Sequence, residues 1–174
     1  MAKLAFTKLG LKLNNEIKTI NFNEQTIEVK QYLPIQDKLE LISNVINLSA
    51  DENNFANPVK VSVYTTIEII SKYTNINFTE KQKEDTPKLY DLLISTGLVT
   101  EIIKAIPEEE YDEVLKGIAD SIEAVYTYRN SVLGILDNIS TDYSNLNLDA
   151  SEIQKKLADP ENMEFLKSVL TKLG

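Results

Sequence analysis

The chain has 174 residues, 43% of them hydrophobic and 26% charged, with a formal net charge of −9. It contains no His, Cys or Trp, and Arg129 is its only arginine. The size and composition fit a globular domain, while the missing residue types disfavour most enzyme mechanisms and exclude disulfides and thiolate zinc sites. The acidic balance argues against nucleic acid as the partner, because phosphates are bound by clustered Lys and Arg.

The first 33 residues have the alternating character of β-strands. They predict a hairpin with strands at 18–22 and 26–31 and a polar turn at 23–25. Because an isolated hairpin is marginal in water, it must pack on helices, gain a third strand from residues 4–13, or pair with another chain. The apolar residues that could make such contacts are Ile20, Phe22, Ile27 and Val29.

Beyond Pro34 the apolar residues follow helical spacing. Thr79 and Gln82 have the spacing of a capping box, and Gly97 marks a helix end. The predicted helices cover residues 35–48, 59–73, a short segment after Thr79, 87–95 and 98–105.

A long helix is predicted after Pro107, with the acidic residues 108–110 stabilising its start. It carries the longest run of helically spaced apolar residues and is therefore expected to be the centre of the core. These residues are Tyr111, Val114, Leu115, Ile118, Ile122, Val125, Val132, Leu133, Leu136 and Ile139.

After a polar connector, the C-terminal residues predict two short amphipathic helices. Such an arm either docks on its own core or offers its apolar face to a partner. The sequence thus indicates a mainly α protein with an N-terminal hairpin region (1–33), a helical core domain (34–140) and a C-terminal helical arm (141–174). The apolar residues of the last helix are Phe165, Leu166, Val169, Leu170 and Leu173.

No residue pattern indicates a catalytic, cofactor or metal site. The acidic residues at 51–52, at 80–85 and at 108–112 lie in polar surroundings, which favours solvated surface or helix capping over acid and base chemistry. No lysine lies in an evidently apolar pocket. Tyr126 and Tyr128 lie beside Arg129 and fit either a binding hot spot or half-buried core tyrosines.

The order of a hairpin ending in residues 27–35, a helix at 37–42 and an all-helical remainder closing with 157–160 and 170–174 resembles a known family. It is similar to the tail assembly chaperones that tailed phages of Gram-positive bacteria encode beside their tail genes. The resemblance implies a non-catalytic protein in the host cytoplasm that binds the tape-measure protein, the tail-tube protein or both, with possible self-association.

Two other binding roles stay open, namely a structural virion component such as a head or tail completion protein, and an acidic inhibitor of a host defence protein. An unrecognised hydrolase is the enzyme alternative, and it would need a buried carboxylate pair in a deep cleft. The start of the chain lacks the apolar core of a signal peptide, and no run of about 18 apolar residues could span a bilayer, so a cytosolic protein without membrane partners is expected.

Overall fold

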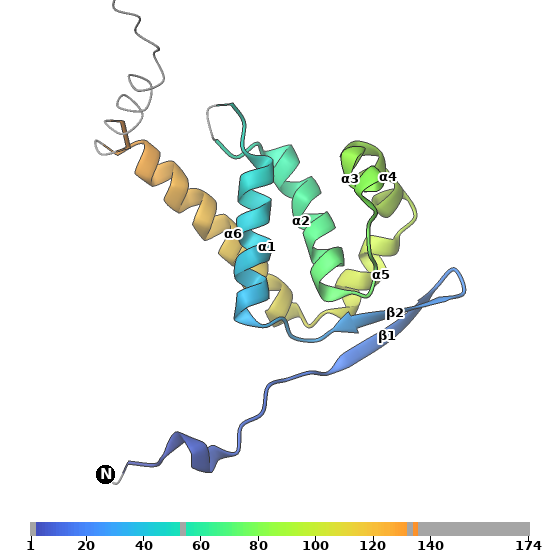
Figure 1. Ribbon diagram of the computed structural model, residues 1–174, viewed down its shortest axis with the longest axis vertical. Coiled ribbons are helices and arrows are strands. Elements are labelled where there is room, and N and C mark those ends of the chain that lie inside the picture. The colour runs from blue at the N-terminus through green and yellow to red at the C-terminus, as the bar shows by residue number, and fades with distance from the viewer. Residues whose placement is uncertain (1–2, 53–54, 132–133, 136–174) are drawn as a thin grey trace, which may run out of the picture. The chain divides into compact units, whose positions relative to one another are not determined.

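The computed structural model describes residues 3–52, 55–131 and 134–135 (Figure 1). The chain divides into two compact units, Met1–Tyr126 and Thr127–Gly174. A mainly helical protein with a small N-terminal hairpin is confirmed. The elements are the 3₁₀ helix η1 (Phe6–Leu9), strands β1 (Ile17–Phe22) and β2 (Gln25–Lys30), and helices α1 (Ile35–Ser49), α2 (Pro58–Tyr73), α3 (Glu80–Glu84), α4 (Thr86–Ser95), α5 (Leu98–Ala105) and α6 (Glu108–Arg129).

The hairpin turn has two residues where three are predicted. Phe22 pairs with Gln25, which leaves only Asn23 and Glu24 in the turn, with φ angles of 48° and 63°. Positive φ at both central positions is the type I′ geometry, whose twist matches that of the flanking strands. Asn tolerates this geometry well, whereas Glu is strained in it.

Replacing Glu24 with glycine is therefore expected to stabilise the protein. A non-glycine residue in the left-handed region costs about 1–2 kcal/mol, and the larger unfolded-state entropy of glycine takes back about 0.5–1 kcal/mol. The free energy of unfolding, measured by urea denaturation, should rise by up to about 1 kcal/mol in Glu24→Gly. The same substitution in the strand, Glu28→Gly, should lower it; a loss at both positions would contradict the strain argument.

The hairpin packs on the helices, which is the first of the three predicted possibilities. Ile27 and Val29 are buried, and Val29 forms a β-bridge with Thr74 just after α2. The backbone N–H of Glu28 donates to Asn75 Oδ1 at 3.1 Å, so the outer edge of β2 is partly closed. Residues 4–13 form no third strand, because apart from η1 they have no regular structure and all of them are exposed.

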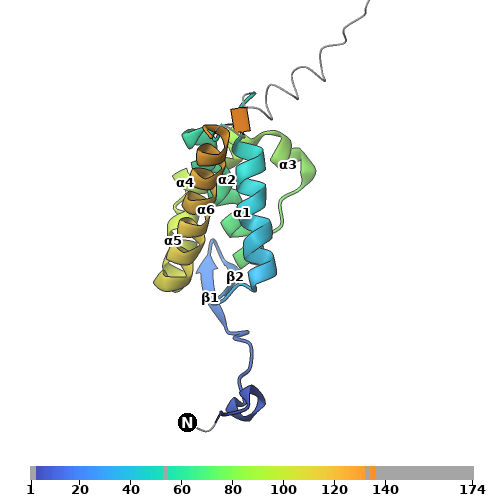
Figure 2. The same ribbon diagram turned by 90° about the vertical axis from the view of Figure 1, so that its left-hand side faces the viewer.

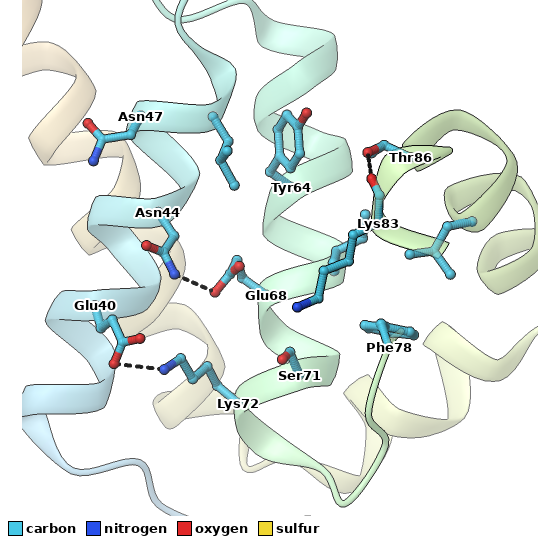
Figure 3. Close-up of a pocket in the computed structure, with 13 residues that line it drawn as sticks. Glu40, Asn44, Asn47, Tyr64, Glu68, Ser71, Lys72, Phe78, Lys83 and Thr86 are labelled. Atoms are coloured by element: carbon cyan, nitrogen blue, oxygen red, sulfur yellow. Dashed lines mark hydrogen bonds and ion pairs between the residues drawn. The ribbon is translucent and has the colours of Figure 1, made fainter. Parts of the chain in front are cut away.

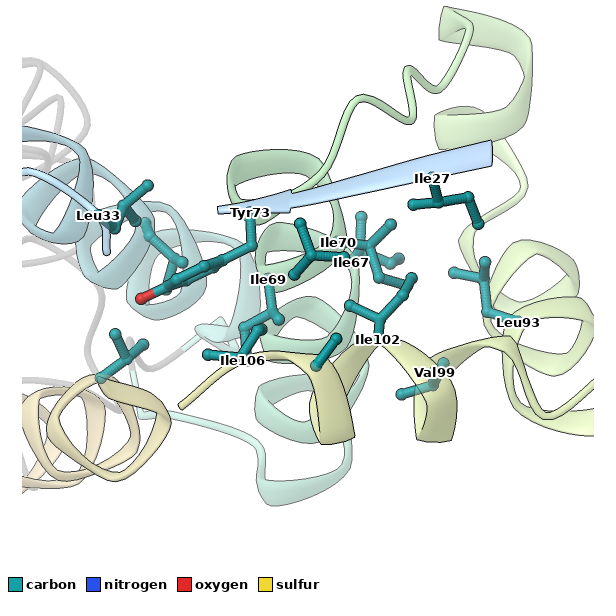
Figure 4. Packing of buried hydrophobic residues seen from close by; sticks show 14 of the residues in the cluster. Ile27, Leu33, Ile67, Ile69, Ile70, Tyr73, Leu93, Val99, Ile102 and Ile106 are labelled. Carbon is teal, nitrogen blue, oxygen red and sulfur yellow. The ribbon is translucent and has the colours of Figure 1, made fainter. Parts of the chain in front are cut away.

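The centre of the core is α2, so the prediction that the long helix after Pro107 holds this place is wrong. Four apolar side chains of α2 are buried, and they contact β2, α4 and α5 (Figure 4). On α6 only Val114 and Ile118 are buried among the apolar residues. The buried α2 residues are Ile67, Ile69, Ile70 and Tyr73.

Helix α6 also ends earlier than predicted. It stops at Arg129, where Ser131 closes a turn by donating from its backbone N–H and its hydroxyl to the carbonyl of Tyr128. The predicted continuation to residue 139 is therefore wrong at residues 130–131, and residues 132–133 and 136–139 lie outside the described residues. The predicted C-terminal arm, 141–174, lies outside them as well.

Helix α6 lies alongside α1, and a glycine sits at their contact (Figure 2). A Cβ atom added at Gly117 would lie 2.7 Å from Ile42 Cδ1, which is far inside van der Waals contact. Glycine thus provides the space that the side chain of Ile42 occupies.

The boundaries of the other helices follow their local caps. Asn57 Oδ1 accepts from the backbone N–H groups of Val59 and Lys60 at the start of α2, and the predicted capping box of Thr79 and Gln82 is present at α3. Gly97 has a φ of 78° and ends α4 as predicted. These local signals explain why the predicted ranges agree closely with the observed ones.

Candidate functional site

The part of the chain that the structure describes contains no group of three or more His, Cys, Asp or Glu residues that could hold a metal ion. The carboxylate of Asp51 accepts a hydrogen bond from the backbone N–H of Phe55 at 2.8 Å and so helps to close its own loop.

Within the described part of the chain, no helix combines the length and the apolar character needed to cross a membrane.

A buried carboxylate joins several segments near the start of α6. Glu110 Oε1 accepts hydrogen bonds from the backbone N–H of Leu33 and from the hydroxyl of Tyr73, each at 2.8 Å. Glu110 Oε2 accepts from Lys38 Nζ at 2.9 Å, and Lys38 also pairs with Glu113. The side chains of Lys38 and Glu110 are only 5% and 8% exposed. This buried charge cluster ties the end of the hairpin, α1 and the end of α2 to the first turn of α6.

The cluster corrects two predictions. The acidic residues 108–112 were expected to be solvated or to cap the helix, which is wrong for Glu110, and Lys38 is a lysine enclosed by the core. The signal for Glu110 is its place on α6: it lies four residues before Val114 and eight before Ile118, and so shares their core-facing side. Helix periodicity could have found it, but its partners could not be predicted locally.

Both proton donors of the cluster have raised pKa values. Burial lowers the pKa of Lys38, but its hydrogen bonds to Glu113 and Glu110 and their negative charges outweigh burial, so the pKa lies above its ordinary value. Burial raises the pKa of the Tyr73 hydroxyl, and the hydrogen bond to Glu110 raises it further. Lys38 Nζ also lies 4.9 Å from the ring centroid of Tyr32. The folded protein therefore holds both protons more tightly than the unfolded chain does.

This predicts a steep loss of stability at alkaline pH. Because both folded-state pKa values are raised, the contribution is fully present below the unfolded-state values of about 10 and is lost as pH rises above them. Each group should lower the free energy of unfolding by up to about 1.4 kcal/mol per pH unit.

Urea denaturation between pH 9 and 11.5 measures this slope. Tyr73→Phe removes one of the groups whose pKa is raised and should make the alkaline slope shallower by up to about 1.4 kcal/mol per pH unit, whatever its effect at neutral pH. Tyr126→Phe, at an exposed tyrosine, is the matched control and should keep the wild-type slope. Equal slopes for Tyr73→Phe and wild type would show that the Tyr73 proton is not held more tightly in the folded state.

A polar cleft of about 520 Å³ lies between α1 and α2 on one side and α3, α4 and Phe78 on the other (Figure 3). Its polar groups largely pair with each other: Glu40 with Lys72 at 2.8 Å, and Asn44 with Glu68 at 3.1 Å. Among the described residues, every buried side-chain nitrogen or oxygen has a hydrogen-bond partner. The cleft thus contains no buried orphaned polar group that would mark the place of a ligand.

A second cavity is apolar and lies between the start of α2 and the second half of α6. It has a volume of about 500 Å³, and among the described residues of its lining Glu123 is the only charged one. At its edge the rings of Phe55 and Tyr126 are tilted against each other with centroids 5.5 Å apart. This apolar groove is lined by Ala56, Pro58, Val61, Ala119, Ile122, Glu123 and Tyr126.

The residues that were predicted to contact partners lie in three parts of the chain, and the structure describes two of them, the hairpin and the end of α6. The hairpin residues face the chain's own core: Ile27 and Val29 are buried, and Ile20 and Phe22 are partly buried against it. The arm residues Phe165, Leu166, Val169, Leu170 and Leu173 lie outside the described residues.

The tyrosines near the end of α6 are exposed. Tyr126 and Tyr128 are 58% and 50% exposed and lie outside the hydrophobic core cluster, so they are surface residues and not part of the core. Arg129 is partly buried at the last position of the helix. Tyr126 lines the apolar groove, so one of the predicted contact residues lies at a cavity.

Sequence reasoning missed a second apolar surface, which lies at the N-terminus. Residues 3–16, here called the N-terminal arm, are all exposed. The third strand that the sequence allows for residues 4–13 is not formed, since the sheet of the described residues consists of β1 and β2 alone. The large apolar side chains exposed on the arm are Leu4, Phe6, Leu9, Leu11 and Leu13.

Comparisons with protein-family models, with curated proteins and with solved structures gave no match.

Proposed function

We propose that this chain is a non-catalytic tail assembly chaperone of a tailed phage, which binds the tape-measure protein or the tail-tube protein in the host cytoplasm. The phage role is supported by the resemblance carried by residues 27–35 and by the closing segments 157–160 and 170–174. The observation that carries the binding role is the apolar groove between α2 and α6.

The groove suits a helical client that has an apolar stripe flanked by basic residues. Its lining is apolar except for Glu123, and Asp120 is exposed beside it on α6. An amphipathic helix can place its apolar face in such a groove while a Lys or Arg at the edge of that face pairs with one of these two carboxylates. The net charge of −9 helps to keep a complex with an apolar client in solution.

Co-expression with the long helical protein encoded by the neighbouring tape-measure gene tests this function. The soluble fraction of the client should rise when the chain is present. Ala119→Lys places a charge in the groove and should remove most of this gain, whereas Ala124→Lys adds the same charge at an exposed position of α6 outside the groove lining and should keep it. A client that is no more soluble with the wild-type chain than without it would overturn the proposal.

Mass spectrometry of purified phage particles separates the chaperone role from its structural rival. A chaperone leaves the assembly before it is complete, so the chain should be absent from finished particles. A fixed copy number per particle would instead identify the chain as a virion component.

A further inference from the structure

The N-terminal arm exposes several large apolar side chains to water, which is unfavourable in free energy. Its five large apolar side chains are between 51% and 73% exposed, and none of its residues is buried. Phe6 and Leu9 lie three residues apart in η1, and side chains at this spacing of a 3₁₀ helix lie on the same side. The arm therefore presents a compact apolar knob, formed by Phe6 and Leu9, that no other part of the described chain covers.

The charge of the arm is opposite to that of the rest of the protein. Residues 3–15 contain Lys3, Lys8 and Lys12 and no acidic residue, whereas the chain as a whole has a formal charge of −9. Attraction between unlike charges brings such an arm to an acidic surface and favours correct partners over wrong ones.

The apolar groove has the complementary features. Its volume of about 500 Å³ and its apolar walls match a knob of one aromatic and one aliphatic side chain. Glu123 lies in its lining and Asp120 is exposed beside it on α6, while the nearest basic residues in sequence are Lys60 on α2 and Lys116 one turn earlier on α6. The charges beside the groove are therefore mixed, and its apolar centre is the feature that fits the apolar knob of the arm.

The arm and the groove lie at opposite ends of the same chain. Leu33, at the end of the hairpin, is bonded to Glu110, and Ala119 follows nine residues later on α6, about 14 Å further along at 1.5 Å per residue. Figures 1 and 2 show the arm leaving the hairpin at the end of the helices opposite to the groove elements. An arm that leads away from its own groove is placed to reach the groove of a neighbouring copy.

We propose that the N-terminal arm of one copy binds the apolar groove of a second copy, with Phe6 and Leu9 inserted between α2 and α6. Because each chain carries one arm and one groove at opposite ends, this contact is heterologous and joins chains head to tail. The arm and a client compete for the same groove, but the contact itself needs no client, so it is tested without one and its failure leaves the proposed chaperone role standing.

Sedimentation velocity of the purified full-length protein, over a concentration series and without client, tests the contact. The mass of the wild-type protein should rise with concentration beyond that of a dimer. Phe6→Asp should abolish this association, while Thr7→Asp, which adds the same charge at the next position of η1, should weaken it only slightly. Ala119→Lys should also abolish it, and Ala124→Lys should leave it near the wild-type level.

Mixing the two defective proteins gives the decisive result. Phe6→Asp keeps an intact groove and Ala119→Lys keeps an intact arm, so an equimolar mixture should form a dimer that does not grow further. The proposal is overturned if the mixture stays monomeric, if Phe6→Asp associates as strongly as Thr7→Asp, or if the wild-type protein is monomeric at all concentrations. Circular dichroism of each variant should match wild type, because all substituted positions are exposed.

Discussion

Replacing Glu110 with alanine should lower the free energy of unfolding by about 3–5 kcal/mol, one of the two largest losses expected for a single substitution in this chain. The substitution leaves the backbone N–H of Leu33 and the hydroxyl of Tyr73 without their acceptor. A buried donor without a partner costs about 1–3 kcal/mol. Lys38 retains Glu113, which is 62% exposed and therefore a weaker partner.

Chemical denaturation of Glu110→Ala and of two matched variants measures this effect. Glu109→Ala removes the same side chain from an exposed neighbouring position and should change stability by less than about 0.5 kcal/mol. Glu113→Ala removes the exposed partner of Lys38 and should cost no more than about 1 kcal/mol. Similar losses in all three variants would show that burial of Glu110 is not what makes it important.

A double variant separates the charge from the hydrogen bonds. Lys38→Met with Glu110→Gln removes both charges but keeps an amide oxygen that can accept from Tyr73 and Leu33. Because replacing a buried ion pair with neutral groups is often close to neutral for stability, the double variant should recover more than half of the loss seen in Glu110→Ala. A double variant as unstable as the single one would mean that the ion pair itself is essential.

The second large effect is expected at Leu41. Its side chain on α1 is fully buried in the core shared with α2, and replacing it with alanine should cost about 2–5 kcal/mol through lost apolar contact and the cavity left behind. Leu39→Ala is the control, since Leu39 lies on the same helix but is 58% exposed and should cost less than about 1 kcal/mol. Thermal unfolding of both variants checks the difference; equal losses would contradict the observed orientation of α1.

The fold was largely predictable because its helices carry local signals. The capping box at Thr79, the proline at the start of α2 and Gly97 each act within one turn of chain, so they locate helix boundaries without knowledge of the rest of the molecule. The hairpin was predicted for the same reason. The length of its turn was not, because Glu24 is an unusual residue at a position with positive φ and its presence did not indicate a two-residue turn.

The orientation of the helices was less predictable, because apolar residues outnumber the core-facing positions. On α1 the buried positions are Lys38, Leu41, Val45 and Ser49, a stripe that begins and ends with polar residues. A pattern of apolar residues alone favours Leu39 over Lys38, yet Leu39 is 58% exposed. Extending the stripe of Leu41 and Val45 back by one turn leads to Lys38, but only the distant Glu110 explains why a lysine is stable there.

The candidate surfaces depend on contacts between distant residues. The apolar groove combines a loop residue, the start of α2 and the second half of α6, and no single segment of sequence contains its pattern. On α6 the apolar residues beyond Ile118 looked like core, but the partly buried Ile122 and the exposed Val125 and Tyr126 lie toward or beyond the edge of the core. An apolar helix face of this kind distinguishes a binding surface from a core only once the neighbouring helices are known.

The position of Glu110 also determines when this protein can finish folding on the ribosome. The hairpin, α1 and α2 are synthesised before α6. The carboxylate of Glu110 accepts hydrogen bonds from the backbone N–H of Leu33, the amine of Lys38 and the hydroxyl of Tyr73, but it is translated 37 to 77 residues after these donors. Domains generally fold as units as the chain emerges, and closing a long loop is entropically costly until its contact forms. The first 73 residues therefore leave the ribosome as an incomplete core, which closes only when the first turn of α6 has emerged.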